Sequence, residues 1–203
     1  MTVNLPPAPQ FGAPVDLKPA PEVLRFLAVR RSHSAVNLIA PGPGPEDLDA
    51  LLRLAARVPD HGKLTPWRFV VLEGADKAAF ADRLDALAAG RGDKKAQNKL
   101  AKLKVPPTAV VVVSTAREDE IPLWEQELSA GAVCTTLLYA ALAMGYGANW
   151  ITDWYSFDPE ATAILGLDPD ERVAGFILLG AFGEPPLERE RPDPAALVSH
   201  WTG

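Results

Sequence analysis

The chain has 203 residues, and its 20 Lys and Arg against 26 Asp and Glu give a formal net charge of −6 at pH 7. A folded monomer of this length buries about 70% of the surface that its unfolded chain exposes, enough for one full core. The acidic balance argues against nucleic acid as a partner, because binding to a phosphate backbone needs clustered Lys and Arg. The single cysteine, Cys134, excludes an internal disulfide framework and any zinc or iron-sulfur cluster held by several thiolates.

The sequence shows neither a signal peptide nor a segment that could span a membrane. Its start, MTVNLPPAPQFGAPVDLKPAP, lacks the cationic and continuous apolar regions of a signal peptide. No run of 18 or more uncharged apolar residues is long enough to cross a bilayer. We therefore expect a cytoplasmic protein without a membrane partner.

The first helix is predicted to follow a proline-rich arm. Residues 1–20 carry five of the twenty prolines, and proline removes the amide donor that helix and sheet interiors need. We expect residues 1–20 to be an extended arm and residues 21–203 to form a single domain. From Pro21 the apolar residues recur at helical spacing, so that a helix would end at Arg30.

Helices and strands then alternate along the chain. In order, the pattern predicts a helix from 45 to 57, a strand at 68–73, helices at 75–89 and 93–104, a strand at 109–115, a helix at 122–144, a strand at 148–152, a helix at 159–165 and a strand at 173–181. This alternation favours layered α/β or α+β architecture over a sandwich of two sheets.

The helix at 122–144 is unusual because its second half, residues 130–144, is apolar almost all round. Such a helix must be covered on nearly every side. In a chain of this size a subunit interface explains the pattern as well as a monomer core does. Gly131 would let another backbone approach closely, although ordinary packing also explains a lone helical glycine.

Several common catalytic motifs are missing. The sequence has no G-x-G-x-x-G turn after a strand and no Walker phosphate loop. With only three histidines and no H-E-x-x-H, we expect no metal site, and no G-x-S-x-G elbow supports a serine hydrolase. Cys134 lies among apolar residues in the middle of a helix, where a thiol is a poor nucleophile.

Four motifs occur together in a recognisable order: RRS (residues 30–32), ARVPDHGKLTPWRF (56–69), WEQELSAGAV (124–133), and GANWIT (147–152) leading to RVAGFILLG (172–180). The chain resembles the nitroreductase family of flavin enzymes, and within it a short bacterial branch in which P-D-H replaces the more usual P-S-x. The resemblance runs from about Pro21 to the end of the chain.

The resemblance implies a three-layer α/β (α+β) fold, with a mixed central sheet of about four strands flanked by helices. It also implies an intertwined homodimer with two FMN sites at the interface, each built from both chains. A long helix that is apolar nearly all round agrees with such an interface, because the second protomer would cover what one chain leaves exposed.

Arg30, Arg31 and Ser32 match the first flavin motif of the family. FMN carries a phosphate dianion and a ring that gains negative charge on reduction, so its site needs cations and hydroxyl donors. These three residues are expected to serve the phosphate, the ribityl chain and the N1/C2 carbonyl edge. The alternative is that arginines at a helix end only complement the helix dipole.

Arg57 and His61 match positions that reach across the interface to the partner's FMN in the short branch. Lys63 lies where larger members place polar residues that contact flavin, so it is expected near the pyrimidine edge. Asp60 either fixes the tautomer or charge of His61 or caps the loop that follows, and the sequence leaves both alternatives open.

Trp150, Ile151 and Thr152 match a segment that lines the flavin by main chain and side chain, although Trp150 also suits a core position. Residues 140–145 correspond to a proposed nicotinamide contact, but they also read as an ordinary buried helix end.

The resemblance implies that the protein transfers hydride from NADH or NADPH through FMN to a small electron-poor acceptor by a ping-pong mechanism. Nitroaromatics, quinones and enones are the acceptors expected. No dedicated acid or base is evident, so a catalytic role for His61 is a hypothesis, and Glu125 and Glu127 are expected to serve the dimer interface. The alternatives are a flavin-binding sensor or carrier without turnover, a flavin-free interaction domain, and dehydrogenation or flavin cleavage on the same scaffold.

Overall fold

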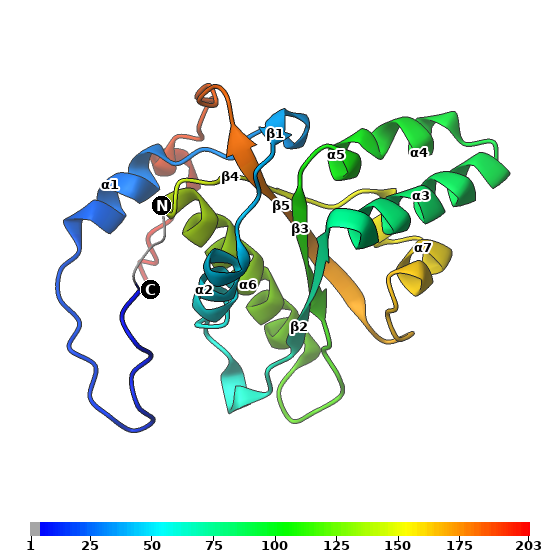
Figure 1. Cartoon of the computed structure of the whole chain (residues 1–203). Helices are drawn as coiled ribbons and strands as arrows, with labels where there is room; N and C mark the ends of the chain where they lie inside the picture. Colours follow the sequence, from blue (N-terminus) through cyan, green and yellow to red (C-terminus); the bar gives the residue numbers. More distant parts are fainter. Residues whose placement is uncertain (1–4) are drawn as a thin grey trace.

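A five-stranded sheet forms the centre of the computed structural model, which describes residues 5–203 (Figure 1). The strands are β1 (Leu38–Ile39), β2 (Trp67–Glu73), β3 (Thr108–Ser114), β4 (Gly147–Ile151) and β5 (Arg172–Phe182). Strand β5 is the longest and pairs with β1, β3 and β4, while β2 pairs with β3. The strand that carries the GANWIT motif therefore lies directly beside β5.

Helices cover both faces of this sheet. They are α1 (Pro21–Val29), α2 (Pro45–Ala55), α3 (Gly74–Gly90), α4 (Lys94–Lys99), α5 (Ala101–Lys104), α6 (Leu123–Ala143) and α7 (Pro159–Ile164), with short 3-10 helices η1 (Ala35–Asn37), η2 (His61–Lys63), η3 (Trp154–Ser156) and η4 (Pro194–Leu197). Helices α2 and α6 lie on one face, and α3, α4, α5 and α7 lie on the other (Figure 1). The predicted α/β class, with a sheet flanked by helices, is confirmed.

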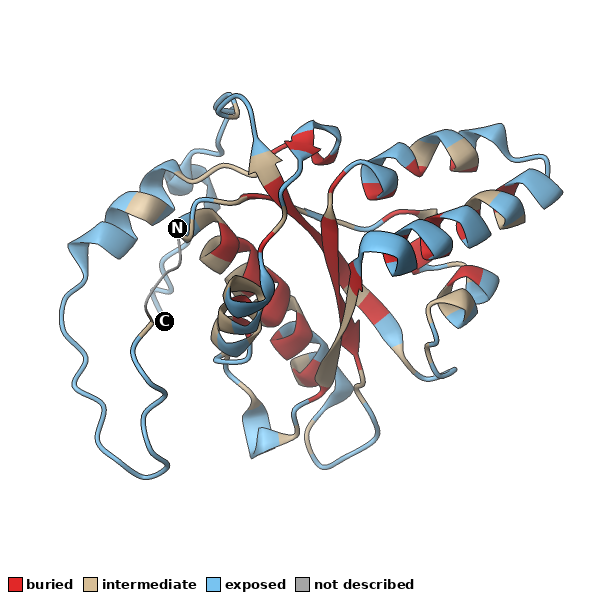
Figure 2. Ribbon diagram, in the orientation of Figure 1, coloured by how far each residue is buried: buried red, intermediate tan, exposed pale blue. Residues whose placement is uncertain are grey.

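The β3 sequence TAVVVVS explains why both faces need a cover. All seven of its residues are buried. Because side chains alternate along a strand, Val110 and Val112 join the core on the α6 face, and Val111 and Val113 join the core on the α3 face. Figure 2 shows this buried interior on both sides of the central strands.

Two details of the predicted sheet and one predicted helix are corrected. All four strand pairings within residues 5–203 are antiparallel, so the sheet is not mixed, and β1 adds a fifth strand. Strand direction depends on the path of the connections, which local patterns do not encode, and β1 has too few residues to show a period. The helix predicted at 93–104 breaks at Leu100, which is fully buried together with Leu103.

The two ends of the chain lie outside this core. Residues 6–20 and 187–203 are exposed along their whole length, and α1 has no buried residue. The first four residues of the predicted arm lie outside the described residues. Within residues 5–203 no helix combines the length and the apolar character needed to cross a membrane.

Candidate functional site

The RRS motif lies in a loop that is fixed to β4. Helix α1 ends where the amide of Arg30 donates to the carbonyl of Phe26. Three residues later, the amide of His33 donates to the carbonyl of Ala148 at 3.0 Å, and the Asn149 side chain donates to the carbonyl of His33. The motif is thereby placed beside the strand that carries Trp150.

One buried nitrogen of Arg30 has no hydrogen-bond partner among residues 5–203. Nη2 of Arg30 donates to Oγ of Ser32 at 3.2 Å, and its guanidinium carbon lies 4.9 Å from the centre of the Tyr139 ring on α6. Its Nε, in contrast, is buried and pairs with no other group in residues 5–203. A buried donor without an acceptor is costly, and the described residues supply no acceptor to this nitrogen.

Arg31 is held by the segment that follows β5. Its Nε donates to the carbonyl of Leu187 at 2.9 Å, and the carboxylate of Glu188 lies 3.6 Å away. Arg191 in the same segment donates to the carbonyl of Arg30 at 3.5 Å. The chain after β5 therefore returns to the RRS loop.

His33, next to this motif, was not singled out by sequence. The residue is 6% exposed, and neither ring nitrogen has a partner among the described residues. It packs against Phe182 with the ring centres 4.1 Å apart. Burial, together with the charge of Arg31, lowers the pKa of His33 below its ordinary value.

The segment from Trp150 to Thr152 ends β4. Nε1 of Trp150 donates to the carbonyl of Ala174 at 3.3 Å, and the indole lies where a Cβ on Gly175 would project. Trp150 is 39% exposed, Ile151 packs against the core on the α3 face, and Thr152 is exposed. Trp150 therefore lies over the sheet without being enclosed in its core.

The second predicted group, which holds Arg57, His61 and Lys63, follows α2. Both carboxylate oxygens of Asp60 accept backbone amides, from Leu64 at 3.1 Å and Thr65 at 2.8 Å. Asp60 thus caps the loop, one of the two roles that the sequence left open. The group that contacts His61 is Glu125, whose Oε2 lies 2.7 Å from Nδ1 of His61.

The same loop is fixed to α6 by Ser129. Its Oγ donates to the carbonyl of Pro59 at 2.8 Å and accepts Nε1 of Trp67 at 3.2 Å. Glu125 and Ser129 are four residues apart, so they lie on one face of the helix. That spacing was visible in WEQELS, but nothing in the sequence showed which loop the face contacts.

The other two residues of this group lie near the N-terminal arm. Arg57 lines a cavity of about 320 Å³ together with residues 5–9, and Nζ of Lys63 lies 6.0 Å from the centre of the Phe11 ring. Both residues are exposed.

One chain does not bring the two predicted groups together. Arg30 contacts Tyr139 near the end of α6, and His61 contacts Glu125 near its start. These helix positions are 14 residues apart, or roughly 21 Å along the axis. In Figure 1, the loop after α1 and the segment between α2 and β2 lie toward opposite ends of α6.

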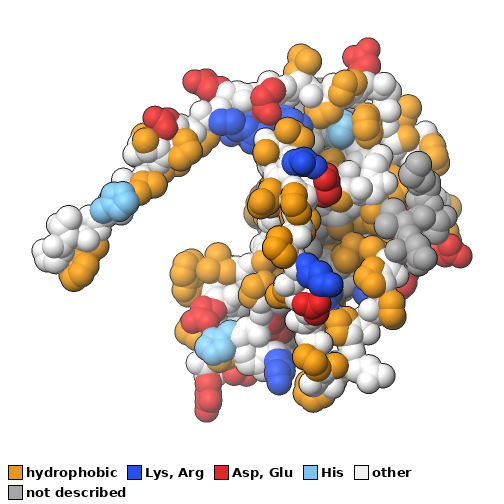
Figure 3. Space-filling model, turned by 90° about the vertical axis from the view of Figure 1, so that its left-hand side faces the viewer, with side chains coloured by type: hydrophobic (Ala, Val, Ile, Leu, Met, Phe, Trp, Pro, Cys, Tyr) orange, Lys and Arg blue, Asp and Glu red, His pale blue; other side chains and the backbone are white. Residues whose placement is uncertain are grey.

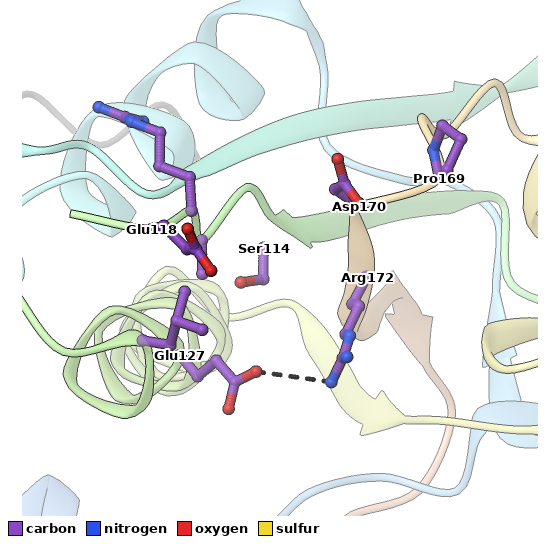
Figure 4. A pocket seen from close by; sticks show the side chains of 9 residues that line it. Ser114, Glu118, Glu127, Pro169, Asp170 and Arg172 are labelled. Carbon is purple, nitrogen blue, oxygen red and sulfur yellow. Dashed lines mark ion pairs between the residues drawn. The ribbon is translucent and has the colours of Figure 1, made fainter.

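A further cavity of about 480 Å³ opens where α6 begins (Figure 4). Ser114, Glu118, Glu127, Asp170 and Arg172 are among its lining residues, and the Glu127 carboxylate points toward Arg172 at 3.7 Å. None of the nine predicted site residues lines this cavity. Its lining carries charges of both signs, so charge alone selects no ligand.

The part of the chain that the structure describes holds one buried thiol and no cluster of metal-ligating side chains. Cys134 is buried, and burial raises the pKa of its thiol to about 12. Within residues 5–203 no three His, Cys, Asp or Glu side chains are grouped to hold a metal ion.

Comparisons with known proteins agree with the motifs. The model of the nitroreductase family matches residues 28–181. An Escherichia coli K12 protein named "Putative NAD(P)H nitroreductase YdjA" is 34% identical over 189 residues, which are 89% of this chain and 100% of that protein.

Solved structures share the fold. A nitroreductase-like family protein from Bacillus cereus matches with a TM-score of 0.75 at 19% identity, covering 94% of this chain and 100% of that one. A nitroreductase with bound FMN from Bacteroides fragilis matches with a TM-score of 0.66 at 23% identity, covering 89% of this chain and 99% of that one.

Proposed function

Because the chain belongs to the nitroreductase family, we propose that it is an FMN-dependent oxidoreductase that uses NADH or NADPH to reduce a small electron-poor acceptor. Nitroaromatics, quinones and enones are the acceptor classes proposed. Bound FMN supplies the hydride transfer, and the protein supplies binding, orientation and electrostatics. Since donor and acceptor react in turn over one ring, the kinetics are ping-pong.

The residues around the RRS loop suit this cofactor. The single observation that carries the proposal is the buried Nε of Arg30, which lacks an acceptor among the described residues, while Nη2 of the same guanidinium donates to the Ser32 hydroxyl. A phosphate or a carbonyl edge of FMN would supply that acceptor, and a guanidinium binds phosphate with paired donors. Arg31 adds a second cation, and Trp150 on the adjacent strand offers a half-exposed indole face.

The position of the second group argues for a homodimer. The α6 contacts of His61 and Arg30 lie roughly 21 Å apart along the helix, too far for both residues to hold the same flavin edge within one chain, and Arg57 and Lys63 belong to the same segment as His61. Two copies with their α6 helices antiparallel would bring the start of one helix beside the end of the other. We therefore propose that Arg57, His61 and Lys63 complete the partner's site.

The exposed apolar surface favours the same assembly. Large hydrophobic side chains are exposed on α1, on the first turns of α6 and in the segment after β5; they include Val23, Leu24, Leu27, Val29, Leu123, Trp124, Leu128, Leu187, Leu197 and Trp201. Figure 3, which views the side that carries α1, shows hydrophobic side chains around a hollow beneath a projecting segment. Groups of exposed large hydrophobic side chains are typical of surfaces that bind another protein chain.

The visible spectrum of the purified protein tests the proposal. We expect a yellow dimer with about one FMN per chain, whose absorbance bleaches on anaerobic addition of NADH or NADPH and returns when a nitroaromatic or quinone is added. A colourless protein that takes up no FMN contradicts the proposal. Bound FMN that the nucleotide does not reduce points instead to a flavin-binding sensor or carrier.

A further inference from the structure

The contact between His61 and Glu125 has a consequence for which ring nitrogen of His61 is free. Glu125 Oε2 lies 2.7 Å from Nδ1, a normal hydrogen-bond distance. An ionised carboxylate only accepts hydrogen bonds, so Nδ1 must carry the proton in this contact. No other described residue hydrogen-bonds to Nε2.

The helix turn that carries Glu125 is held firmly. The side chain of Gln126 is 2% exposed and makes three hydrogen bonds to the preceding loop, to both backbone groups of Arg117 and to the carbonyl of Ile121, at 2.9 to 3.1 Å. One turn later, Ser129 bonds the carbonyl of Pro59. Glu125 therefore extends from a fixed backbone toward a loop that is fixed to the same helix.

The His61 side of the contact is held equally well. Asp60 caps the amides of Leu64 and Thr65, and Gly62 takes a φ of +72° that favours glycine. A Cβ on Gly62 would lie 3.1 Å from the Ile121 side chain. The backbone of this loop thus has little freedom, and the Glu125 contact is what orients the ring.

We propose that Glu125 is a positioning residue for His61, which fixes the proton on Nδ1 and leaves Nε2 as the only ring nitrogen available to a ligand. A histidine that binds a ligand through one nitrogen commonly has its tautomer set by the group on the other. The ligand is the flavin of the partner's site, and in this respect the inference rests on the proposed function. Glu125 itself does not touch the reacting atoms.

Glu125 also lies in the first turn of α6, where an acidic side chain stabilises a helix by its charge alone. The two roles separate in substitutions. Glu125→Gln and Glu125→Ala both remove the charge, but only the glutamine keeps an oxygen that accepts a hydrogen bond from Nδ1. Glu127→Ala is the matched control, because it removes a neighbouring acid that pairs with Arg172 and not with His61.

Nitrogen-15 NMR can determine which ring nitrogen of His61 carries a proton. The protein is labelled at its histidines, purified with its bound flavin and measured at pH 8. We expect a proton on Nδ1 of His61 in the wild type, in Glu125→Gln and in Glu127→Ala, and its loss in Glu125→Ala. A wild-type Nδ1 without a proton overturns the inference even if no variant folds. A signal in Glu125→Ala that matches the wild type overturns it as well.

Flavin titration separates this inference from the proposed function. We expect the Kd for FMN to rise about tenfold in Glu125→Ala, because one oriented hydrogen bond is lost. In Glu125→Gln and Glu127→Ala the Kd should stay within about twofold of the wild-type value. If the NMR result holds while His61→Gln leaves the Kd unchanged, the positioning role is supported and the placement of His61 in the flavin site is contradicted.

Discussion

The guanidinium carbon of Arg30 lies 4.9 Å from the centre of the Tyr139 ring, and this contact fixes the RRS loop against the far end of α6. A cation over an aromatic face is stabilised by the ring quadrupole. Tyr139 packs against the buried cluster on the α6 face, so its ring is held in place by the core. The ring in turn holds the guanidinium group of Arg30. Arg30 is therefore oriented before any ligand binds.

Arg30→Lys is expected to bind FMN on the order of 10- to 100-fold more weakly than the wild type. Lysine keeps the charge but lacks both the planar stack on Tyr139 and the second donor nitrogen. Quenching of FMN fluorescence on titration gives the Kd. Arg53→Lys, at an exposed position on α2, serves as the control. Equal FMN affinity in the wild type, Arg30→Lys and Arg53→Lys would show that Arg30 does not belong to the flavin site.

His33 is expected to make the protein less stable as the pH falls below about 6.5. Because burial lowers the pKa of His33, the unfolded chain takes up a proton at a higher pH than the folded one. The contribution of His33 to the free energy of unfolding is complete above the pKa that His33 has in the unfolded chain. As the pH falls from there toward its pKa in the folded protein, this contribution decreases by at most about 1.4 kcal/mol per pH unit. Urea unfolding at pH 7.5 and pH 5 measures this loss.

His33→Phe keeps a flat ring against Phe182 and removes the titration. Its loss of stability between pH 7.5 and pH 5 should be smaller than that of the wild type. Parallel pH profiles for the two proteins would show that His33 contributes nothing to the pH dependence.

Gly175→Ala is expected to displace the Trp150 indole rather than to unfold the chain. A Cβ at this position would overlap the indole, and Trp150 is 39% exposed, so the ring has room to move outward. We expect altered tryptophan fluorescence and a several-fold higher Kd for FMN, with a Tm within a few degrees of wild type. Unchanged fluorescence would show that the indole does not lie on Gly175.

Cys134 is expected to resist alkylation in the folded protein. Burial raises the pKa of the thiol to about 12, so almost no thiolate exists at pH 8, and the sulfur is enclosed in the core. Mass spectrometry after iodoacetamide treatment should show modification only in denaturant. Rapid labelling of the native protein would contradict the burial of this helix face.

Sequence patterns predicted the helices and strands better than they predicted which segments and side chains come into contact. The valine run of β3 and the apolar half of α6 are local patterns, and both form the expected strand and helix. The direction of the strands depends on long connections, which local patterns do not encode. The prediction of a mixed sheet was therefore wrong. Two residues, as in β1, carry no readable period.

The candidate site shows the same limit. RRS and PDH are readable as motifs, but Glu125 lies 64 positions from His61, and no local rule pairs them. Asp60, adjacent in sequence, was the natural candidate for that partner, yet its carboxylate is taken by two backbone amides. The Arg30–Tyr139 contact was equally invisible, because a tyrosine in a buried helix suits the core.

The central claim is that each flavin site takes Arg30 from one chain and His61 from the other, and mixed dimers test it most directly. Arg30→Ala and His61→Gln are each expected to bind FMN poorly as homodimers. Co-expressed with different tags and purified as the mixed dimer, they should recover one tight FMN per dimer, because one of the two sites then carries neither substitution. A mixed dimer that binds FMN as poorly as its parents would contradict the claim, since a site built within one chain gains nothing from the exchange.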